Sequence, residues 1–140
     1  MILVIDTNIL LASLIRDSTT RKIIVESGWN FFYPEMSFHE IREYKDLVID
    51  KSGMNEKEYI SLLNHLLKHV ALVPEEQVKG KIGEAKELLG KIDPDDVIFL
   101  ATTLSMDDSK IWSDDTHFEK QSRIRVFKTK HIVRIFFSIC

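Results

Sequence analysis

Short apolar runs alternate with longer amphipathic segments along this chain. The continuous apolar run at residues 2–5 is typical of a strand that is buried in a sheet, and the segments 29–33 and 71–73 also predict strands. Residues 110–113 and 125–128 predict two further strands. Apolar positions spaced three and four apart predict helices over residues 9–15, 19–27, 37–49, 56–69, 75–89, 94–104 and 130–138.

The order of these elements predicts the architecture. Strands that alternate with helices form a mostly parallel sheet, and right-handed crossovers place helices on both of its faces. We therefore expect one α/β domain over residues 1–140, a three-layer α/β/α sandwich with a central sheet of about five strands. Ligands bind in such folds outside the carboxyl ends of the strands.

Polar residues mark where several helices begin. Asn8 can cap the helix that follows the first strand. Ser37 and Glu40 match the Ser-x-x-Glu capping box. Asp93 followed by Pro94 predicts a capped helix with proline at its first position.

Four carboxylates lie where strands and helices would present them to a common point. Asp6 and Asp115 follow apolar strands, whereas Glu40 and Asp96 lie in the first turns of helices. Each alone has an ordinary structural explanation, as a helix cap, a capping-box partner, a first-turn acid or a turn residue. Together they would repel one another unless a cation compensated them. Because Mg²⁺ and Mn²⁺ prefer carboxylate oxygen, the four acids predict a divalent metal site.

Composition and charge narrow the class of protein. The single cysteine, Cys140, gives neither a disulfide framework nor a cysteine metal site. No apolar run approaches the roughly 20 residues that a membrane span needs, so we expect a cytoplasmic protein without a membrane partner. The net charge of -3 does not indicate nucleic acid by itself, yet no acid follows Glu119. The basic residues Lys120, Arg123, Arg125, Lys128 and Lys130 either bind RNA phosphates or form a solvated surface.

Other phosphate chemistries lack their motifs. The sequence has no Walker loop, no Rossmann glycine fingerprint and no Gly-x-Ser-x-Gly elbow. Phosphatases of the haloacid dehalogenase class need Asp-x-Asp after the first strand, where this chain has Asp6-Thr7-Asn8. Metal-assisted hydrolysis of a phosphodiester remains the chemistry that the acids support best.

The ordered motifs resemble those of PIN domains. They are Asp6-Thr7-Asn8 after the first strand, Glu40 early in a helix, the run from Asp96 to Thr102, and Ser-Asp-Asp-Thr-His-Phe at residues 113–118. The resemblance spans residues 2–127. It implies a metal-dependent ribonuclease that acts on single-stranded RNA and leaves 5′-phosphate and 3′-hydroxyl ends. Many relatives are VapC-type toxins of VapBC toxin–antitoxin pairs, and others process ribosomal RNA.

The resemblance also implies roles for individual residues. Asp6, Glu40, Asp96 and Asp115 would be the catalytic metal ligands, and Thr7, Asn8 and Ser113 would orient them.

Two positions have a competing neighbour. Asp95 competes with Asp96, which we prefer because the apolar run follows it directly. Asp114 competes with Asp115, which we prefer because the family places this acid two residues after a serine or threonine.

Other functions and partners stay open. The chain could be a catalytically weak PIN-fold module that binds RNA or protein, or an RNA-maturation nuclease rather than a toxin. Expected partners are single-stranded or structured RNA, an antitoxin protein across the acidic groove, and a second copy of the chain. The apolar faces at residues 59–67 and 132–139 would form that homodimer or belong to the core.

Overall fold

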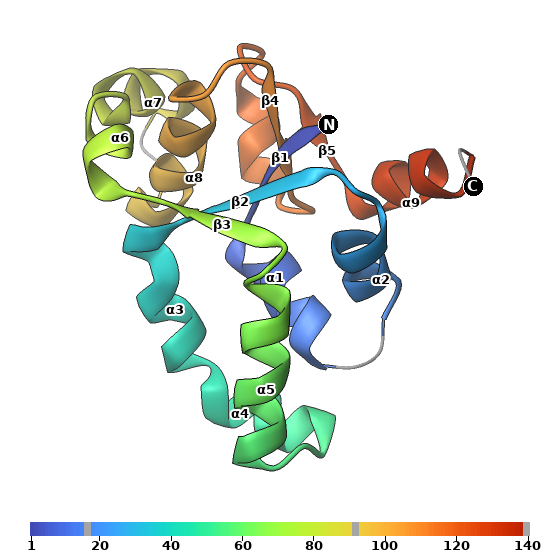
Figure 1. The fold of residues 1–140 in the computed structure, drawn as a ribbon. Helices are drawn as coiled ribbons and strands as arrows, with labels where there is room; N and C mark the ends of the chain where they lie inside the picture. Colours follow the sequence, from blue (N-terminus) through green and yellow to red (C-terminus); the bar gives the residue numbers. More distant parts are fainter. Residues whose placement is uncertain (16–17, 91–92, 139–140) are drawn as a thin grey trace.

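The computed structural model, which describes residues 1–15, 18–90 and 93–138, is built around a parallel sheet (Figure 1). Its elements in chain order are β1 (Ile2–Ile5), α1 (Thr7–Ile15), α2 (Thr19–Glu26), β2 (Asn30–Pro34), η1 (Glu35–Ser37), α3 (Phe38–Glu43), α4 (Lys45–Ser52), α5 (Glu56–Leu66), β3 (Val70–Val73), α6 (Glu75–Lys79), α7 (Ile82–Leu89), α8 (Pro94–Leu104), β4 (Ser109–Trp112), η2 (Thr116–Lys120), β5 (Val126–Phe127) and α9 (Thr129–Ser138). Cys140 lies outside the described residues.

The predicted α/β class and parallel sheet are confirmed. The five strands have the order β3-β2-β1-β4-β5, and every neighbouring pair is parallel. The strand order reverses at β1, whose neighbours are β2 on one side and β4 on the other. This reversal marks the point at the carboxyl edge where ligands bind in open parallel sheets. The predicted strand bounds differ from the observed ones by at most one residue.

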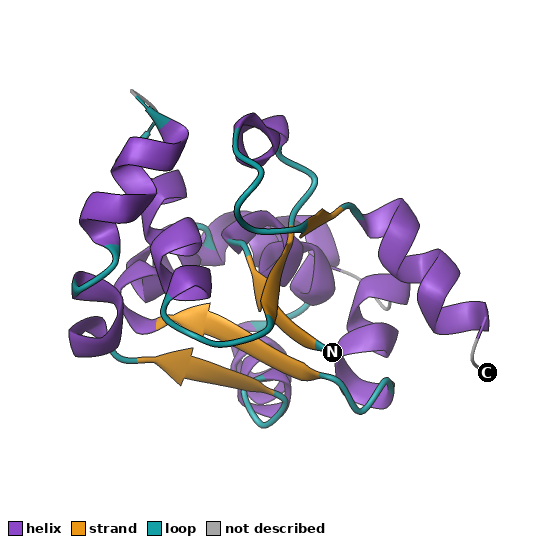
Figure 2. Ribbon diagram, turned by 90° about the horizontal axis from the view of Figure 1, so that it is seen from above, coloured by secondary structure: helices purple, strands orange, loops and turns teal. Residues whose placement is uncertain are grey.

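Helices cover both faces of the sheet, as the sandwich prediction requires. Helix α8 packs on β1, β2 and β4, and α6 and α7 pack on α8. Helices α1, α2 and α5 lie together on the opposite face, where α9 packs against α2 (Figures 1 and 2). The core of the sandwich is mainly apolar, with Leu3, Ile5, Leu100 and Trp112 completely buried. None of the helices in the described ranges is long and apolar enough to cross a membrane.

Two predicted long helices are each divided in the structure. The predicted helix 37–49 is interrupted at Tyr44, whose φ and ψ of -94° and 5° leave the helical range. The backbone N–H of Tyr44 donates to the carbonyl oxygen of Glu40 and so closes α3. The predicted helix 75–89 is interrupted between Lys79 and Ile82, where Gly80 ends α6. Glycine weakens a helix interior because its backbone is free in the unfolded chain.

Two of the predicted helix caps are wrong. Asp6, not Asn8, caps α1, because the backbone N–H of Ile9 donates to Asp6 Oδ1 at 2.9 Å. The side chain of Ser37 makes no capping hydrogen bond. Glu40 is instead held by a contact from outside its own helix. The predicted cap at Asp93, whose side chain accepts from the N–H of Asp95, is confirmed.

The apolar faces considered for a dimer contribute mainly to the core of the chain itself. Tyr59 and Leu66 in α5, and Ile132 and Phe136 in α9, are buried within this single copy. Ile139 lies outside the described residues. The homodimer therefore stays a prediction.

Candidate metal centre

Acidic side chains from four parts of the fold line one open cleft at the carboxyl edge of the sheet. They are Asp6 after β1, Glu40 in α3, Asp96 in α8 and Asp115 between β4 and η2. The cleft has a volume of about 190 Å³, and its other lining residues are Thr7, Asn8, Tyr44, Asp93, Asp95 and Phe99. All of these residues lie within the described ranges of the chain, and none of them is basic. The cleft thus gathers six carboxyl groups, and no basic side chain lies among its lining residues to balance their negative charge.

The alignment of β1 with β4 places Ser113 beside Asp6. The parallel register pairs Ile5 with Trp112, so the next residue of each strand leaves the sheet at the same point. The Ser113 hydroxyl donates a hydrogen bond to Asp6 Oδ2. Its oxygen also accepts a 3.0 Å hydrogen bond from the backbone N–H of Asp115. One buried hydroxyl therefore positions two of the acids.

Asp6 carries a carboxyl group that is costly to ionise in the folded protein. Burial raises the pKa of Asp6 to about 6. The nearby charges of Asp115 and Asp114 add to this rise, whereas the hydrogen bonds from Ser113 and Ile9 oppose it. A cation beside Asp6 would favour the ionised carboxylate and remove this cost.

Glu40 ends a buried chain of hydroxyl groups. Thr7 Oγ1 lies 2.6 Å from Glu40 Oε2 and 2.8 Å from the hydroxyl of Tyr33. The Tyr33 hydroxyl in turn lies 2.9 Å from the carbonyl oxygen of Ser37. The hydroxyl groups of Thr7 and Tyr33 supply two hydrogens for these three contacts. All three contacts can be hydrogen bonds at the same time only when the Glu40 carboxyl group is protonated and supplies a third hydrogen. Burial raises the pKa of Glu40 and so favours that proton in the metal-free protein.

The second oxygen of Glu40 fits a role as a ligand. Oε1 is buried, and no residue in the described ranges forms a hydrogen bond with it. A buried polar atom without a partner costs free energy, so it requires an explanation. Carboxylate oxygens are the hard donors that Mg²⁺ and Mn²⁺ prefer. The residues of the cleft therefore fit a divalent cation.

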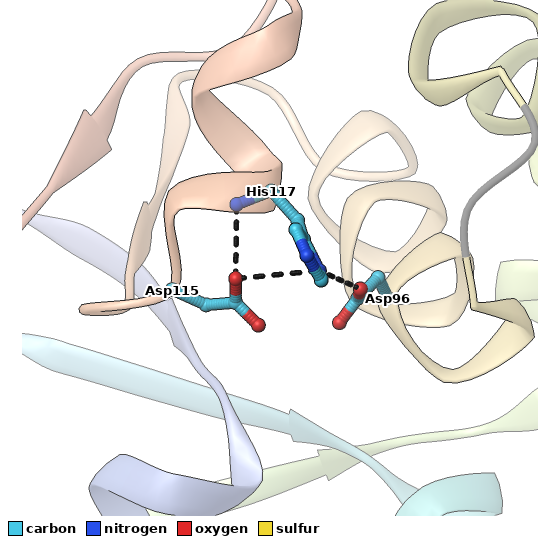
Figure 3. A group of neighbouring side chains, drawn as sticks. All are labelled: Asp96, Asp115 and His117. Atoms are coloured by element: carbon cyan, nitrogen blue, oxygen red, sulfur yellow. Dashed lines mark hydrogen bonds and ion pairs between the residues drawn. The ribbon is translucent and has the colours of Figure 1, made fainter.

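Asp96 and Asp115 face each other across the imidazole of His117 (Figure 3). His117 Nδ1 lies 2.9 Å from Asp96 Oδ2 and 3.4 Å from Asp115 Oδ1. Partial burial raises the pKa of Asp96, and the hydrogen bond with His117 works against that rise. These three residues form a group whose ligand atoms lie within 4.8 Å of one another.

A model of the PIN domain family matches residues 4–132 of the chain. The chain belongs to the PIN domain family. Two solved structures share its fold: VapBC2 from Rickettsia felis bound to a DNA fragment from the VapBC2 promoter, with 14% identity and a TM-score of 0.68, and VapBC-1 from nontypeable Haemophilus influenzae, with 18% identity and a TM-score of 0.65. Each likeness covers 91% of this chain and 98% of the other chain. No curated protein sequence matches the chain. PIN domains are generally nucleases that use divalent metals.

In the structure of this PIN domain, the competing aspartates make different contacts. Asp114 turns to the start of α9, where it accepts hydrogen bonds from the Thr129 N–H at 2.8 Å and the Thr129 hydroxyl at 2.6 Å. Asp115 lines the cleft, and Asp114 does not. Asp95 and Asp96 both line it, but only Asp96 contacts His117.

The predicted orienting residues of this PIN domain also differ in their surroundings. Thr7 and Ser113 are buried and contact Glu40 and Asp6, respectively. Asn8 is exposed at the rim of the cleft.

The basic residues predicted to bind RNA do not line the acidic cleft. Arg123 and Arg125 line a separate cavity with Asp107 and Asp108, beside the amino end of β4. The Arg125 guanidinium lies 4.7 Å from the ring centroid of Phe127.

The lysines of this segment lie elsewhere. Lys128 follows β5 at the carboxyl edge of the sheet and forms a 3.4 Å ion pair with Glu119. Lys120 and Lys130 are exposed.

Sequence reasoning missed two residues of this PIN domain. Tyr33 belongs to an apolar strand and was expected only as part of it, although its hydroxyl belongs to the chain that ends at Glu40. His117 entered the sequence analysis only as part of the motif at residues 113–118. The spacing Asp-x-His at residues 115–117 was the available signal, but its partner Asp96 is 21 positions distant.

Proposed function

We propose that this PIN domain is a divalent-metal-dependent endoribonuclease that uses Mg²⁺ or Mn²⁺. One observation carries the proposal: Asp6, Glu40, Asp96 and Asp115, from four separate parts of the chain, line one cleft without a basic side chain among the residues that form it. Acidic side chains with a purely structural role are usually paired with cations or exposed to solvent. Carboxyl groups with shifted pKa values that lie together in a cleft are typical of functional sites.

Each acid has a role in this proposal. Asp6, Asp96 and Asp115 would hold the ion, and Glu40 would offer its buried Oε1. When bound, the ion would lower the pKa of a coordinated water and offset the charge of the phosphate. Ser113 fixes the Asp6 carboxylate and the backbone before Asp115, so that the acids need little reorganisation on binding.

The substrate would approach over the lysines at the same edge of the sheet. Lys128 and Lys130 flank Thr129, whose partner Asp114 is the direct neighbour of Asp115. Positive side chains beside the acids would bind RNA phosphates and place a phosphodiester at the cleft. The products would be RNA fragments with 5′-phosphate and 3′-hydroxyl ends, as the family resemblance implies.

We further propose that the chain acts as the toxin of a toxin–antitoxin pair. The two solved structures of the same fold are VapBC assemblies, which supports an antitoxin partner. Tyr44 and Leu47 in α3–α4 are exposed apolar side chains, and Tyr44 also lines the cleft. An antitoxin segment that packs on them would cover the acids. Expression in a bacterial host should then arrest growth, and the Asp96→Asn variant should not.

Cleavage of RNA in a metal titration tests the enzyme directly. Purified protein with Mn²⁺ or Mg²⁺ should cut a single-stranded RNA labelled at one end, and Asp96→Asn should reduce the rate by several orders of magnitude. The matched control is Asp50→Asn, which changes an exposed aspartate on α4. Failure to cut RNA, together with no divalent binding by calorimetry, would refute the proposal. Metal and RNA binding without cleavage would favour a binding module.

A further inference from the structure

The imidazole of His117 lies between two acids of the cleft. Its Nδ1 contacts Asp96 Oδ2 at 2.9 Å and Asp115 Oδ1 at 3.4 Å. In Figure 3 the second oxygen of each carboxylate points to the same side of the imidazole. The cluster therefore presents a nitrogen and several carboxylate oxygens around one small volume, with one side open.

The distances in this cluster match those between neighbouring ligands of one ion. Two ligands at right angles on an octahedral ion with bonds of about 2.1 Å lie about 3.0 Å apart. The two contacts of His117 Nδ1, at 2.9 Å and 3.4 Å, lie on either side of this value. An ion can therefore replace the hydrogen that Nδ1 shares with Asp96 while the side chains shift only slightly.

The imidazole is not needed to build the turn that carries it. The backbone N–H of His117 donates to Asp115 Oδ1 at 2.9 Å and so closes the start of η2. The next residue, Phe118, is buried and anchors the turn in the core. The His117 side chain is 48% exposed, so its burial adds little to folding. A fixed backbone thus presents a half-exposed imidazole to two carboxylates, as a preorganised ligand set requires.

We propose that His117 Nδ1 is a direct ligand of the divalent cation, together with one carboxylate oxygen each from Asp96 and Asp115, and that it makes the site prefer Mn²⁺ and Co²⁺ over Mg²⁺. The inference rests on the metal site of the proposed function. It adds a nitrogen ligand and a stronger preference for Mn²⁺ and Co²⁺ than a purely carboxylate site would have.

Ligand chemistry gives the reason for the preference. Carboxylate oxygens suit Mg²⁺ and Mn²⁺, whereas an imidazole nitrogen binds transition metals better than it binds Mg²⁺. Mg²⁺ also gives up its water reluctantly and demands near-ideal octahedral geometry. One nitrogen in the ligand set therefore raises the affinity for Mn²⁺ and Co²⁺ and leaves the affinity for Mg²⁺ almost unchanged.

Pulsed electron paramagnetic resonance of the Mn²⁺-loaded protein tests the nitrogen ligand without any measurement of activity. Wild type should show coupling of the Mn²⁺ electron spin to a directly bound ¹⁴N nucleus. His117→Asn should lose this coupling. The control His65→Asn removes an exposed imidazole from α5 and should keep it. The wild-type spectrum alone decides the point if the His117 variant fails to fold.

Calorimetry with MnCl₂ and MgCl₂ tests the preference. His117→Asn should bind Mn²⁺ at least about tenfold more weakly and bind Mg²⁺ as wild type does. His117→Asp supplies an oxygen in place of the nitrogen and should reduce the ratio of Mn²⁺ to Mg²⁺ affinity. His65→Asn should change neither affinity.

Two results would overturn this inference. Mn²⁺ that binds wild type without ¹⁴N coupling would exclude the nitrogen ligand, and an equal loss of both metals in His117→Asn would exclude the preference. Either result leaves the proposed ribonuclease intact, because RNA cleavage is measured separately. Conversely, ¹⁴N coupling in a protein that cuts no RNA would support the ligand and contradict the proposed enzyme.

Discussion

The hydroxyl of Ser113, directly after β4, donates a hydrogen bond to the carboxylate of Asp6, directly after β1. Both side chains are buried, and the same Ser113 oxygen accepts the N–H of Asp115. The two neighbouring parallel strands are therefore joined at their carboxyl ends by the group that orients the acids. A change at Ser113 should thus affect both the fold and the metal site.

Ser113→Ala should leave Asp6 Oδ2 buried without its donor. We expect a loss of about 1–3 kcal/mol in the free energy of unfolding and a roughly 10- to 100-fold weaker affinity for Mn²⁺. Ser109→Ala is the matched control. Ser109 is a buried serine at the other end of β4, and its hydroxyl bonds to backbone carbonyls of Thr103 and Met106. The Ser109→Ala variant should be less stable than wild type in denaturation but should retain the affinity for Mn²⁺ in calorimetry.

Asp6→Asn should stabilise the metal-free protein at neutral pH. Burial raises the pKa of Asp6 from 3.8 to about 6, so the folded state binds more protons than the unfolded state between these values. Stability from this group is therefore present below about pH 4 and is lost as the pH rises through 6. The difference between these two pKa values corresponds to at most about 3 kcal/mol in the free energy of unfolding at pH 7.

The pH dependence makes this prediction specific. The advantage of Asp6→Asn in urea denaturation should shrink as the pH falls from 7 to 4, and Mn²⁺ should stabilise wild type but not the variant. Asp50→Asn on α4 controls for the loss of one negative charge. A destabilised Asp6→Asn protein at every pH would instead indicate that Asp6 serves mainly as the cap of α1.

Asp114 and Asp115 should give opposite results despite their adjacency. Asp114→Ala removes the two hydrogen bonds to Thr129 at the start of α9 and should cost about 1 kcal/mol of stability. It should leave Mn²⁺ affinity nearly unchanged. Asp115→Asn should retain stability and lose at least about tenfold in Mn²⁺ affinity. Parallel thermal melts and titrations would show the contrast, and equal metal affinities in the two variants would contradict it.

Thr7→Val should weaken the support of Glu40. Valine keeps the shape of threonine but leaves Glu40 Oε2 and the Tyr33 hydroxyl without their shared partner. We expect a loss of about 1–3 kcal/mol of stability and weaker Mn²⁺ binding. Thr7→Ser retains the hydroxyl and should preserve the metal affinity. If both variants bind Mn²⁺ like wild type, Glu40 does not depend on this contact.

The basic residues should separate into two groups in RNA binding. Lys128→Ala and Lys130→Ala should each weaken binding of a single-stranded RNA and lower the slope of log K against log salt by about 0.7. Arg123→Ala, beside the amino end of β4, should change neither quantity. Fluorescence anisotropy over a range of KCl concentrations, in Ca²⁺ to prevent cleavage, would measure both. A larger effect of Arg123→Ala would place the RNA on the opposite edge of the sheet.

The sequence predicted those features that local chemistry determines. Buried strands such as residues 2–5 are apolar without interruption, and parallel strands bring their carboxyl ends to one edge, so the position of Asp6 followed directly. The contacts of Glu40 did not follow. Its spacing from Ser37 fits a capping box, but Thr7, 33 positions earlier, contacts it in the folded chain.

Contacts between distant segments were the part that could not be predicted. Lys128 and Arg125 are only three positions apart in sequence, but β5 lies between them, so one lies at the carboxyl edge and the other at the amino edge of the sheet. Likewise, His117 contacts Asp96 only because the packing of α8 brings Asp96 near η2.

The hydrogen bond between Ser113 and Asp6 joins residues that are 107 positions apart. During synthesis at about 5–20 residues per second, roughly 5–20 seconds separate the translation of these two residues. The acids of the cleft cannot meet until β4 has left the ribosome and inserted beside β1. A nascent chain of this PIN domain therefore cannot assemble the proposed metal site until most of the chain has emerged.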